Sequence, residues 1–280
     1  MTPIIRPALL PWLTAFTLVV SSGQASAQPI LLDLMQRHGV ALPERGIEGA
    51  FDEGVTPMIP VTAGSFAGPL AMLTSSTGGD QIAAAYAFGI LAGRSGRAAA
   101  PAEVAAAGQA LVQMIVSADR RARIAGARVA GRVLAVPFEA TAVSVLPPGL
   151  ADALFALLNH TNETEQLAAL DALGLVREPS AVSAITERYY FYRESRKRAL
   201  AGGAVEALAR IGDASSVDVV KVLAADRWAE GKDATALAVA FARQRLLKDG
   251  SLAVIQQALD DKSRRAQARG YLAELGAPVP

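Results

Sequence analysis

An apolar residue recurs along the alanine-rich body of the chain, and a very small residue usually stands two positions before it. The apolar positions are Leu91, Val133, Val176, Ile211, Leu247 and Leu275, and the preceding residues are Gly89, Gly131, Gly174, Ala209, Arg245 and Ala273. The steps of 42, 43, 35, 36 and 28 residues are about the length of a helical hairpin. A single hairpin cannot bury its apolar face alone, so hairpins of this kind stack on their neighbours. The pattern therefore predicts an all-α fold, a right-handed α-solenoid of stacked antiparallel helix pairs.

Within this body, the helical period is clearest between residues 162 and 261. Val182, Ile185, Tyr189 and Tyr192 fall on one stripe of a helix, which indicates a face packed against a neighbour. Similar stripes recur at Leu200, Ala204, Leu208 and Ile211, and again at Leu252, Ile255 and Leu259. Further helices are predicted at residues 79–93, 101–117 and 119–135, and from Leu150 to Leu158. The stretch from Pro137 to Pro148 is expected to be a long connection, since proline interrupts helices.

Three turns in the regular part share an apolar residue, any residue and then an acid. The acids are Glu178, Asp213 and Asp249, and each is expected to accept hydrogen bonds from the free N–H groups that open the following helix. Asn162 and Glu165 have the spacing of a capping box, in which each side chain bonds a backbone N–H of the other.

The first-helix sequences carry a family resemblance. Ala169 to Glu178 reads Ala-Leu-Asp-Ala-Leu-Gly-Leu-Val-Arg-Glu, and Ala204 to Asp213 reads Ala-Val-Glu-Ala-Leu-Ala-Arg-Ile-Gly-Asp. This form resembles HEAT repeats, including the related HEAT-like repeats of phycobilisome lyases. The resemblance covers residues 66–276 and implies a curved stack that serves as a scaffold or binding surface, with no catalytic residues in the repeat. Arg245 departs from the small residue that the pattern has at its position.

The first 27 residues have the features of an export signal. Arg6 supplies a positive charge, Leu9 to Val20 is apolar, and Ala25-Ser26-Ala27 is a small-residue cleavage site. An uncleaved anchor would need about 20 apolar residues, whereas this stretch is shorter and contains Pro11. We therefore expect a periplasmic or secreted protein with no stable membrane insertion after cleavage. Residues 28–65, with the turn-prone run 46–54, are expected to be an irregular N-terminal arm or cap, 66–276 the repeat domain and 277–280 a tail.

Composition narrows the function. Removing residues 1–27 takes away one arginine and no acid, which leaves 26 basic and 26 acidic residues. A general nucleic-acid binder is disfavoured, because affinity for phosphate backbones needs a large basic excess. The absence of cysteine excludes disulfides and thiol catalysis. His38 and His160 have no second ligand at metal-binding spacing, and no nucleotide-binding or hydrolase motif occurs. The sequence predicts no metal, no cofactor and no enzymatic activity.

A group of aromatic and basic residues is the preferred contact surface. Phe191 points about 180° away from the buried stripe and Tyr190 about 80°, so both are difficult to bury in the same interface. Aromatic residues beside an arginine are the composition that interface hot spots favour. The predicted partner-binding residues are Tyr190, Phe191, Arg193 and Trp228.

Two clusters of arginine form a second candidate surface. A basic ridge is predicted at Arg120, Arg121, Arg123, Arg196 and Arg198, where stacked repeats can align charges that attract an anionic partner. The alternative is that these are solvated residues of first helical turns, paired with nearby acids.

The leading hypothesis is a non-enzymatic exported HEAT-like scaffold that binds a protein partner through its curved repeat surface. One alternative is an enzyme or chromophore-attaching factor that resembles the phycobilin lyases, which requires a pocket with convergent polar groups. The other alternative is a binder of an anionic polymer that uses the arginine ridge.

Overall fold

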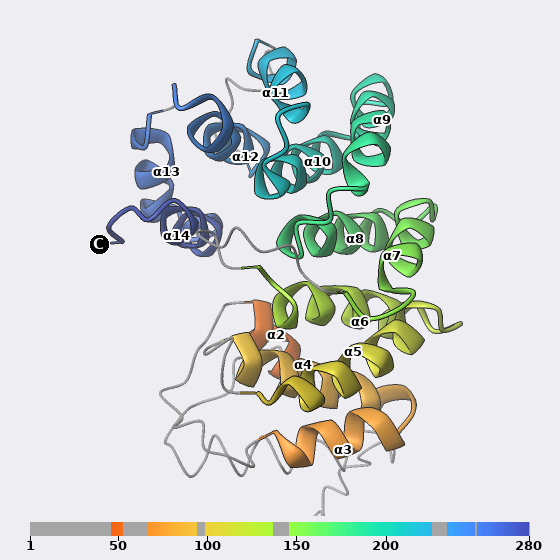
Figure 1. The fold of residues 1–280 in the computed structure, drawn as a ribbon. Helices are drawn as coiled ribbons and strands as arrows, with labels where there is room; N and C mark the ends of the chain where they lie inside the picture. The colour runs from red at the N-terminus through yellow and green to blue at the C-terminus, as the bar shows by residue number, and fades with distance from the viewer. Residues whose placement is uncertain are drawn as a thin grey trace, which may run out of the picture.

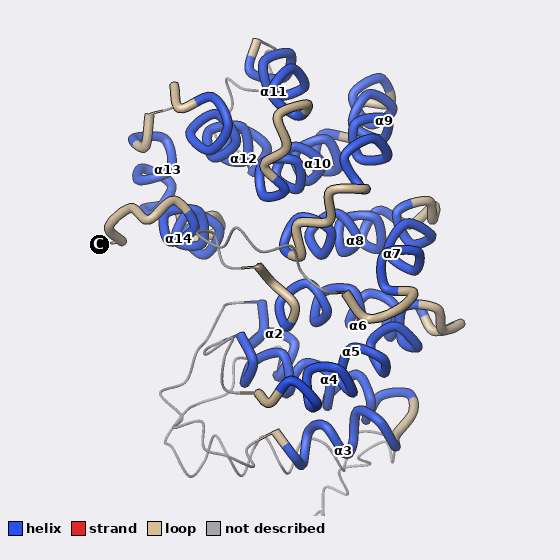
Figure 2. Tube along the Cα trace, in the orientation of Figure 1, coloured by secondary structure: helices blue, strands red, loops and turns tan. Residues whose placement is uncertain are grey.

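The computed structural model describes residues 46–52, 66–93, 99–136, 146–225, 234–249 and 251–279. Every regular element in these ranges is helical, which confirms the predicted all-α class (Figures 1 and 2). The α-helices are α2 (Gly46–Asp52), α3 (Ala67–Ser75), α4 (Gly78–Gly93), α5 (Pro101–Ile115), α6 (Arg120–Val133), α7 (Leu150–Leu158), α8 (Glu163–Leu175), α9 (Ala181–Glu194), α10 (Arg198–Ile211), α11 (Ser216–Ala224), α12 (Ala234–Ala242), α13 (Ala253–Gln257) and α14 (Arg265–Glu274). The π-helical turn η2 (Arg243–Leu247) and the 3₁₀ turn η3 (Ala258–Asp260) complete the set.

Alternate helices form a row in which α4, α6, α8, α10 and α12 pack in chain order (Figure 1). Contacts between α6 and α8 show that these two helices run parallel. Near their starts, Arg123 Nη2 lies 2.6 Å from Glu165 Oε1. Just beyond α6, Val136 N donates to Leu175 O at the end of α8, over 3.0 Å. Helices α6 and α8 therefore present the same end to each other.

Small residues let the row helices approach closely. A Cβ added at Gly131 of α6 would lie 2.7 Å from Ala172 Cα, and one at Gly174 of α8 would lie 2.8 Å from Ala207 Cα. Real Cβ atoms essentially never approach backbone atoms so closely. At these two positions, the small residue of the sequence repeat is therefore the contact point between successive row helices.

A second set of helices covers one side of the row. Helix α5 packs on α6, α7 on α8, and α9 and α11 on α10. The predicted stripe of α9 faces this contact, since Ile185, Tyr189 and Tyr192 are fully buried and Val182 is 9% exposed. Short turns within each pair give the hairpins their antiparallel arrangement.

Helix α2 lies on the opposite side of the row, where the sequence predicted an irregular segment. Phe51 is buried against Tyr86 of α4, with ring centroids 5.1 Å apart. Arg132 of α6 lies 4.0 Å from the Phe51 ring and donates from Nη1 to Phe51 O over 2.9 Å. These tertiary contacts stabilise a helix in a glycine-rich run whose local composition favours turns. The predicted export signal and the remainder of residues 28–65 lie outside the described residues.

The turn acids behave as predicted in two of three turns. Glu178 Oε1 accepts from Ser180 N over 3.1 Å, and Asp213 Oδ1 accepts from Ser215 N over 2.7 Å. Both serines immediately precede the next helix. Asp249 instead pairs with Arg243, with its Oδ1 3.3 Å from Nε.

The capping box at Asn162 forms only in part. Asn162 Oδ1 accepts from the backbone N–H groups of Thr164 and Glu165, so it caps α8 as predicted. The Glu165 carboxylate is buried and bonds Arg123 and His160. The Glu165 carboxylate therefore bonds Arg123 on the adjacent row helix instead of the backbone N–H of Asn162.

The regular row changes at the fifth of the six positions where the sequence repeat has a small residue. Arg245 occupies that position, and α12 continues there as the wider π-helical turn η2. The Arg245 side chain extends over the preceding turn, where a Cβ added at Gly212 would lie 3.8 Å from Arg245 Nη2. A side chain this long does not fit between closely packed helices, so the next hairpin attaches in another way.

Substituting Gly174 tests the close contact in the row. Gly174→Ala is expected to lower the free energy of unfolding by about 1–3 kcal/mol, because its Cβ meets backbone of α10. Gly270→Ala in α14 is the matched control, since an added Cβ there meets nothing within 4 Å. Alanine at this site is expected to raise stability by about 0.5–1 kcal/mol. Urea unfolding followed by circular dichroism measures both; equal effects at the two sites would contradict the packing argument.

Asp261, in the turn before α14, generates a pH prediction. Hydrogen bonds from the Ser263 hydroxyl and backbone N–H, together with Arg264, lower the pKa of Asp261 from 3.8 to about 2. A lowered acid pKa stabilises the fold above the unfolded-state value, and this contribution is lost as pH falls through the folded-state value. The melting temperature of the wild type is therefore expected to exceed that of Asp261→Asn at pH 5, with the gap closing between about pH 4 and pH 2. Ser263→Ala removes the hydroxyl hydrogen bond that lowers the pKa of Asp261, so it is expected to narrow the pH range over which the gap in melting temperature closes. A gap that does not depend on pH would contradict the lowered pKa of Asp261.

Candidate functional site

The aromatic residues of α9 divide cleanly by exposure. Tyr189 and Tyr192 are fully buried, whereas Tyr190 is 42% and Phe191 47% exposed. Arg193 on the same helix is also exposed. Trp228, the fourth predicted contact residue, lies outside the described residues.

The two exposed rings are supported by their neighbours. Tyr190 packs edge-on against Tyr189 at 5.2 Å, and Phe191 against Tyr192 at 5.9 Å. The Arg188 guanidinium lies 5.8 Å from the centroid of the Phe191 ring, and it donates from Nη2 to Asn159 Oδ1 at the end of α7. The rings are therefore held in place before any partner arrives, which reduces the entropy lost on binding. We call Tyr190 and Phe191 the α9 aromatic surface.

The predicted basic ridge is divided between structural and exposed arginines. Arg123 is half-buried, pairs with Glu165 and donates from Nη1 to Ser117 O and Ala118 O. The Arg123 guanidinium is therefore bound by groups of the chain itself. Arg120 and Arg121 at the start of α6 are exposed. Arg196, in the turn before α10, is exposed, and the neighbouring Arg198 is half-buried.

A cluster that the sequence analysis did not predict surrounds Arg210 at the end of α10. Its Nη1 lies 2.6 Å from Asp171 Oδ1 on α8, and its Nη2 lies 2.7 Å from Glu206 Oε1 on α10. Glu274 of α14 accepts from Nε, at 3.2 and 3.1 Å for its two oxygens, and from Nη2 at 2.9 Å. One guanidinium thus joins three helices. We call this the Arg210 cluster.

Tyr271 extends the cluster along α14. Its hydroxyl donates to Glu206 and accepts from Gln267 Nε2 over 2.8 Å. Its ring stacks on Phe241 of α12, with centroids 4.3 Å apart and planes inclined by 13°. Helix α14 is therefore attached to α10 by charge and hydrogen bonds, and to α12 by an aromatic stack.

Burial and charge together set the protonation of this cluster. Burial opposes the charge on Arg210, but Glu206, Asp171 and Glu274 raise its pKa well above the ordinary value. Burial raises the pKa of Glu206, and Arg210 offsets only part of that effect. Burial and the Glu206 charge also raise the pKa of Tyr271 well above its ordinary value. The cluster is thus an arginine fixed in its charged form and surrounded by acceptors.

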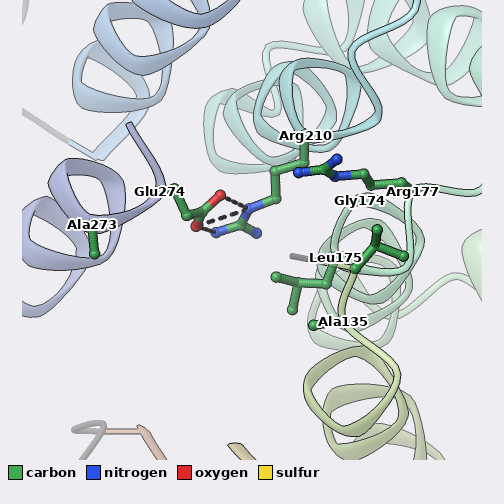
Figure 3. A pocket seen from close by; sticks show the side chains of 8 residues that line it. Ala135, Gly174, Leu175, Arg177, Arg210, Ala273 and Glu274 are labelled. Atoms are coloured by element: carbon green, nitrogen blue, oxygen red, sulfur yellow. Dashed lines mark hydrogen bonds and ion pairs between the residues drawn. The ribbon is translucent and has the colours of Figure 1, made fainter. Parts of the chain in front are cut away.

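Two cavities flank the Arg210 cluster, and α14 forms a wall of each. The first, of about 340 Å³, lies between the ends of α6, α8 and α10 and is lined by Leu175, Arg177, Arg210 and Glu274 among others (Figure 3). The second, of about 430 Å³, has Leu167, Gly202, Gly203 and Ala238 on its apolar side. Arg198, Glu206 and Gln267 supply its polar groups.

No metal site is found among the described residues, where no group of three or more His, Cys, Asp or Glu side chains is arranged to hold an ion. The carboxylates of the Arg210 cluster converge on a guanidinium, which fills the place that a cation would take. None of the described helices combines the length and apolar character needed to cross a bilayer.

The Arg210 cluster left only a partial signal in the sequence. Glu206 and Arg210 are four residues apart on a helix, a spacing at which ion pairs form. Glu274 follows 64 residues later, and no local pattern connects it with Arg210. The contact depends on where α14 lies, and hence on how the row ends.

Comparison with known proteins assigns no family. No protein-family model matches the chain, and no curated protein matches it significantly. Among solved structures, the chain is similar to the crystal structure of an engineered protein from the Northeast Structural Genomics Consortium, with 20% identity and a TM-score of 0.38 over 89% of this chain and 96% of that one. A similarity of this size assigns neither function nor family.

Removing the central cation tests the Arg210 cluster. Arg210→Met is expected to lower the free energy of unfolding by about 3 kcal/mol, because three carboxylates in a partly buried site lose their shared counter-ion. Arg243→Met is the control, since it removes an exposed pair with Asp249 that contributes about 0–1 kcal/mol. Chemical denaturation of both variants measures the difference. A loss below about 1 kcal/mol for Arg210→Met would show that the cluster is not structural.

Proposed function

We propose that this chain is a non-enzymatic, exported HEAT-like α-solenoid that binds a protein partner through the outer face of its second helices. The α9 aromatic surface carries the proposal, because two aromatic side chains on one helix remain 42% and 47% exposed. Exposed aromatic residues with a neighbouring arginine are enriched at binding hot spots. The parallel row and its regular small-residue contacts support the HEAT-like assignment, and the right-handed sense follows from that resemblance.

The distribution of the terminal helices supports the choice of face. Helix α2 covers part of the row at α4 and α6, and α14 covers it at α10, both on the side away from α7 and α9 (Figure 1). A partner approaching that side meets helices of the chain itself. The outer face of α9 carries no such cover among the described residues. The second-helix face is therefore the more accessible of the two.

Rigid support explains how such a face binds. Tyr190 and Phe191 lie on a helix whose opposite stripe is fully buried, so binding needs little ordering of the scaffold. A partner with an apolar groove or a ring-sized pocket would bury both rings. The residues Tyr190, Phe191 and Arg193 then act as anchors, with Trp228 as the fourth proposed contact.

The basic ridge supports a second candidate, the binding of an anionic polymer. Arg120, Arg121 and Arg196 are exposed, and they precede or begin row helices that share one edge. Binding through these residues would weaken steeply with salt, whereas binding through the aromatic rings would not. Salt dependence of the affinity therefore separates the two candidates.

The decisive variant is Phe191→Asp. Because the ring is exposed, we expect stability within about 0.5 kcal/mol of the wild type, together with a loss of partner affinity of at least about tenfold. The measurement is retention of proteins from an extract of the source organism on the immobilised wild type and variant, followed by titration of a purified retained protein.

Tyr189→Asp is the control for misfolding, since it places a charge at a fully buried position of the same helix. We expect it to unfold the chain. If Phe191→Asp also unfolds the chain, the ring is part of the core; if it folds and retains every partner of the wild type, the α9 aromatic surface is not the binding site.

A further inference from the structure

Helix α14 is attached to the row differently from the helices before it. Gly131 and Gly174 bring successive row helices into backbone contact. On α14, an added Cβ at Gly270 meets nothing within 4 Å. The attachment depends on side chains instead, with Tyr271 stacked on Phe241 and Glu274 bonded to Arg210. Ala268 and Leu272 of the same helix are fully buried as well.

The sequence of α14 makes a weak helix when it stands alone. The helix has ten residues, with Gly270 in its interior, and isolated helices shorter than about 12–15 residues are marginal in water. Its first turn contains Arg265 and no acid, and its last turn contains Glu274 and no base. Both charges oppose the helix dipole. Docking on Arg210 removes the second conflict, because the guanidinium neutralises Glu274 at the helix end (Figure 3).

Docking of α14 also supplies one wall of each of the two cavities beside the Arg210 cluster. Ala273 and Glu274 line the cavity of about 340 Å³, and Gln267 lines the cavity of about 430 Å³. The opposite walls belong to the row, with Leu175 on α8 in the first and Leu167 on α8 in the second. Undocking would remove the α14 wall and expose the α8 and α10 residues that line both cavities.

We infer that α14 is a releasable cover, which undocks from Arg210 and Phe241 as a unit while the row stays folded. Its buried side chains lie on one face of a single short helix, and its own sequence gives little helical stability. Elements of this kind open locally at lower free energy than the core. Opening controls access to the side of the row that faces away from α7 and α9, which we call the inner side. It goes beyond the proposed function, because it does not involve the α9 aromatic surface.

Two variants that each remove one carboxylate from Arg210 test the inference. Glu274→Gln weakens the tie to α14, whereas Asp171→Asn removes a comparable partner that ties α8 to α10. The measurement is hydrogen–deuterium exchange of the full chain, comparing amides of residues 265–274 with those of 198–211. In the wild type, we expect exchange in α14 to be at least about tenfold faster than in α10.

In Glu274→Gln, exchange in α14 is expected to rise by a further factor of about ten, with exchange in α10 unchanged. In Asp171→Asn, exchange in α14 is expected to stay within about twofold of the wild type.

Trypsin gives a second readout, since cleavage after Arg269 requires α14 to open. It is expected to speed up in Glu274→Gln alone. Equal exchange in α14 and α10, or a parallel rise in both helices in Glu274→Gln, would overturn the inference by showing that α14 opens only when the whole chain unfolds. Phe191→Asp should exchange like the wild type in α14, so this test and that of the proposed function fail independently.

Discussion

Backbone contact between successive row helices is the constraint on which the rest of this structure depends. At Gly131 and Gly174, a single methyl group would collide with the Cα of the next helix. Helices this close have little freedom to slide or tilt, so α6, α8 and α10 share one direction and align their ends. The turns then fall into register, and an acid in each of two successive turns meets the start of the following helix.

Alignment of the row also gathers charged side chains on its inner side. Arg128 and Arg132 of α6, Asp171 of α8, and Glu206 and Arg210 of α10 stand at corresponding places of their helices. Glu48 of α2 lies 3.6 Å from Arg128, and Glu274 of α14 pairs with Arg210. The chain thus uses complementary charge in attaching both α2 and α14 to the row.

The features that the sequence predicted correctly are those carried by short, repeated spacings. The buried stripe through Ile185, Tyr189 and Tyr192 follows from the helical period alone, and the exposure of Phe191 follows from its angle to that stripe. The recurrence of the small residues predicted stacked helices, and the structure adds that Gly131 and Gly174 lie at the contacts between them. The helix at Gly46–Asp52 was not predicted, because Phe51 is buried by residues up to 81 positions away.

The predicted role of Glu165 failed for a similar reason, since Arg123 on another row helix competes with the local cap. The Arg210 cluster unites residues 171, 206 and 274, of which only the first two lie in the part with regular repeats. Arg245 was recognised as an irregular position, but its consequence, a π-helical turn and a changed attachment of the next hairpin, depends on space that only the folded chain defines.

The charges on the inner side of the row also connect more than one pair of helices. Asp171 acts on the basic residues of both adjacent row helices, by raising the pKa of Arg132 against the effect of burial and by pairing directly with Arg210. A single acid on α8 therefore couples α6 to α10, so that loss of its charge would act on both helix contacts at once.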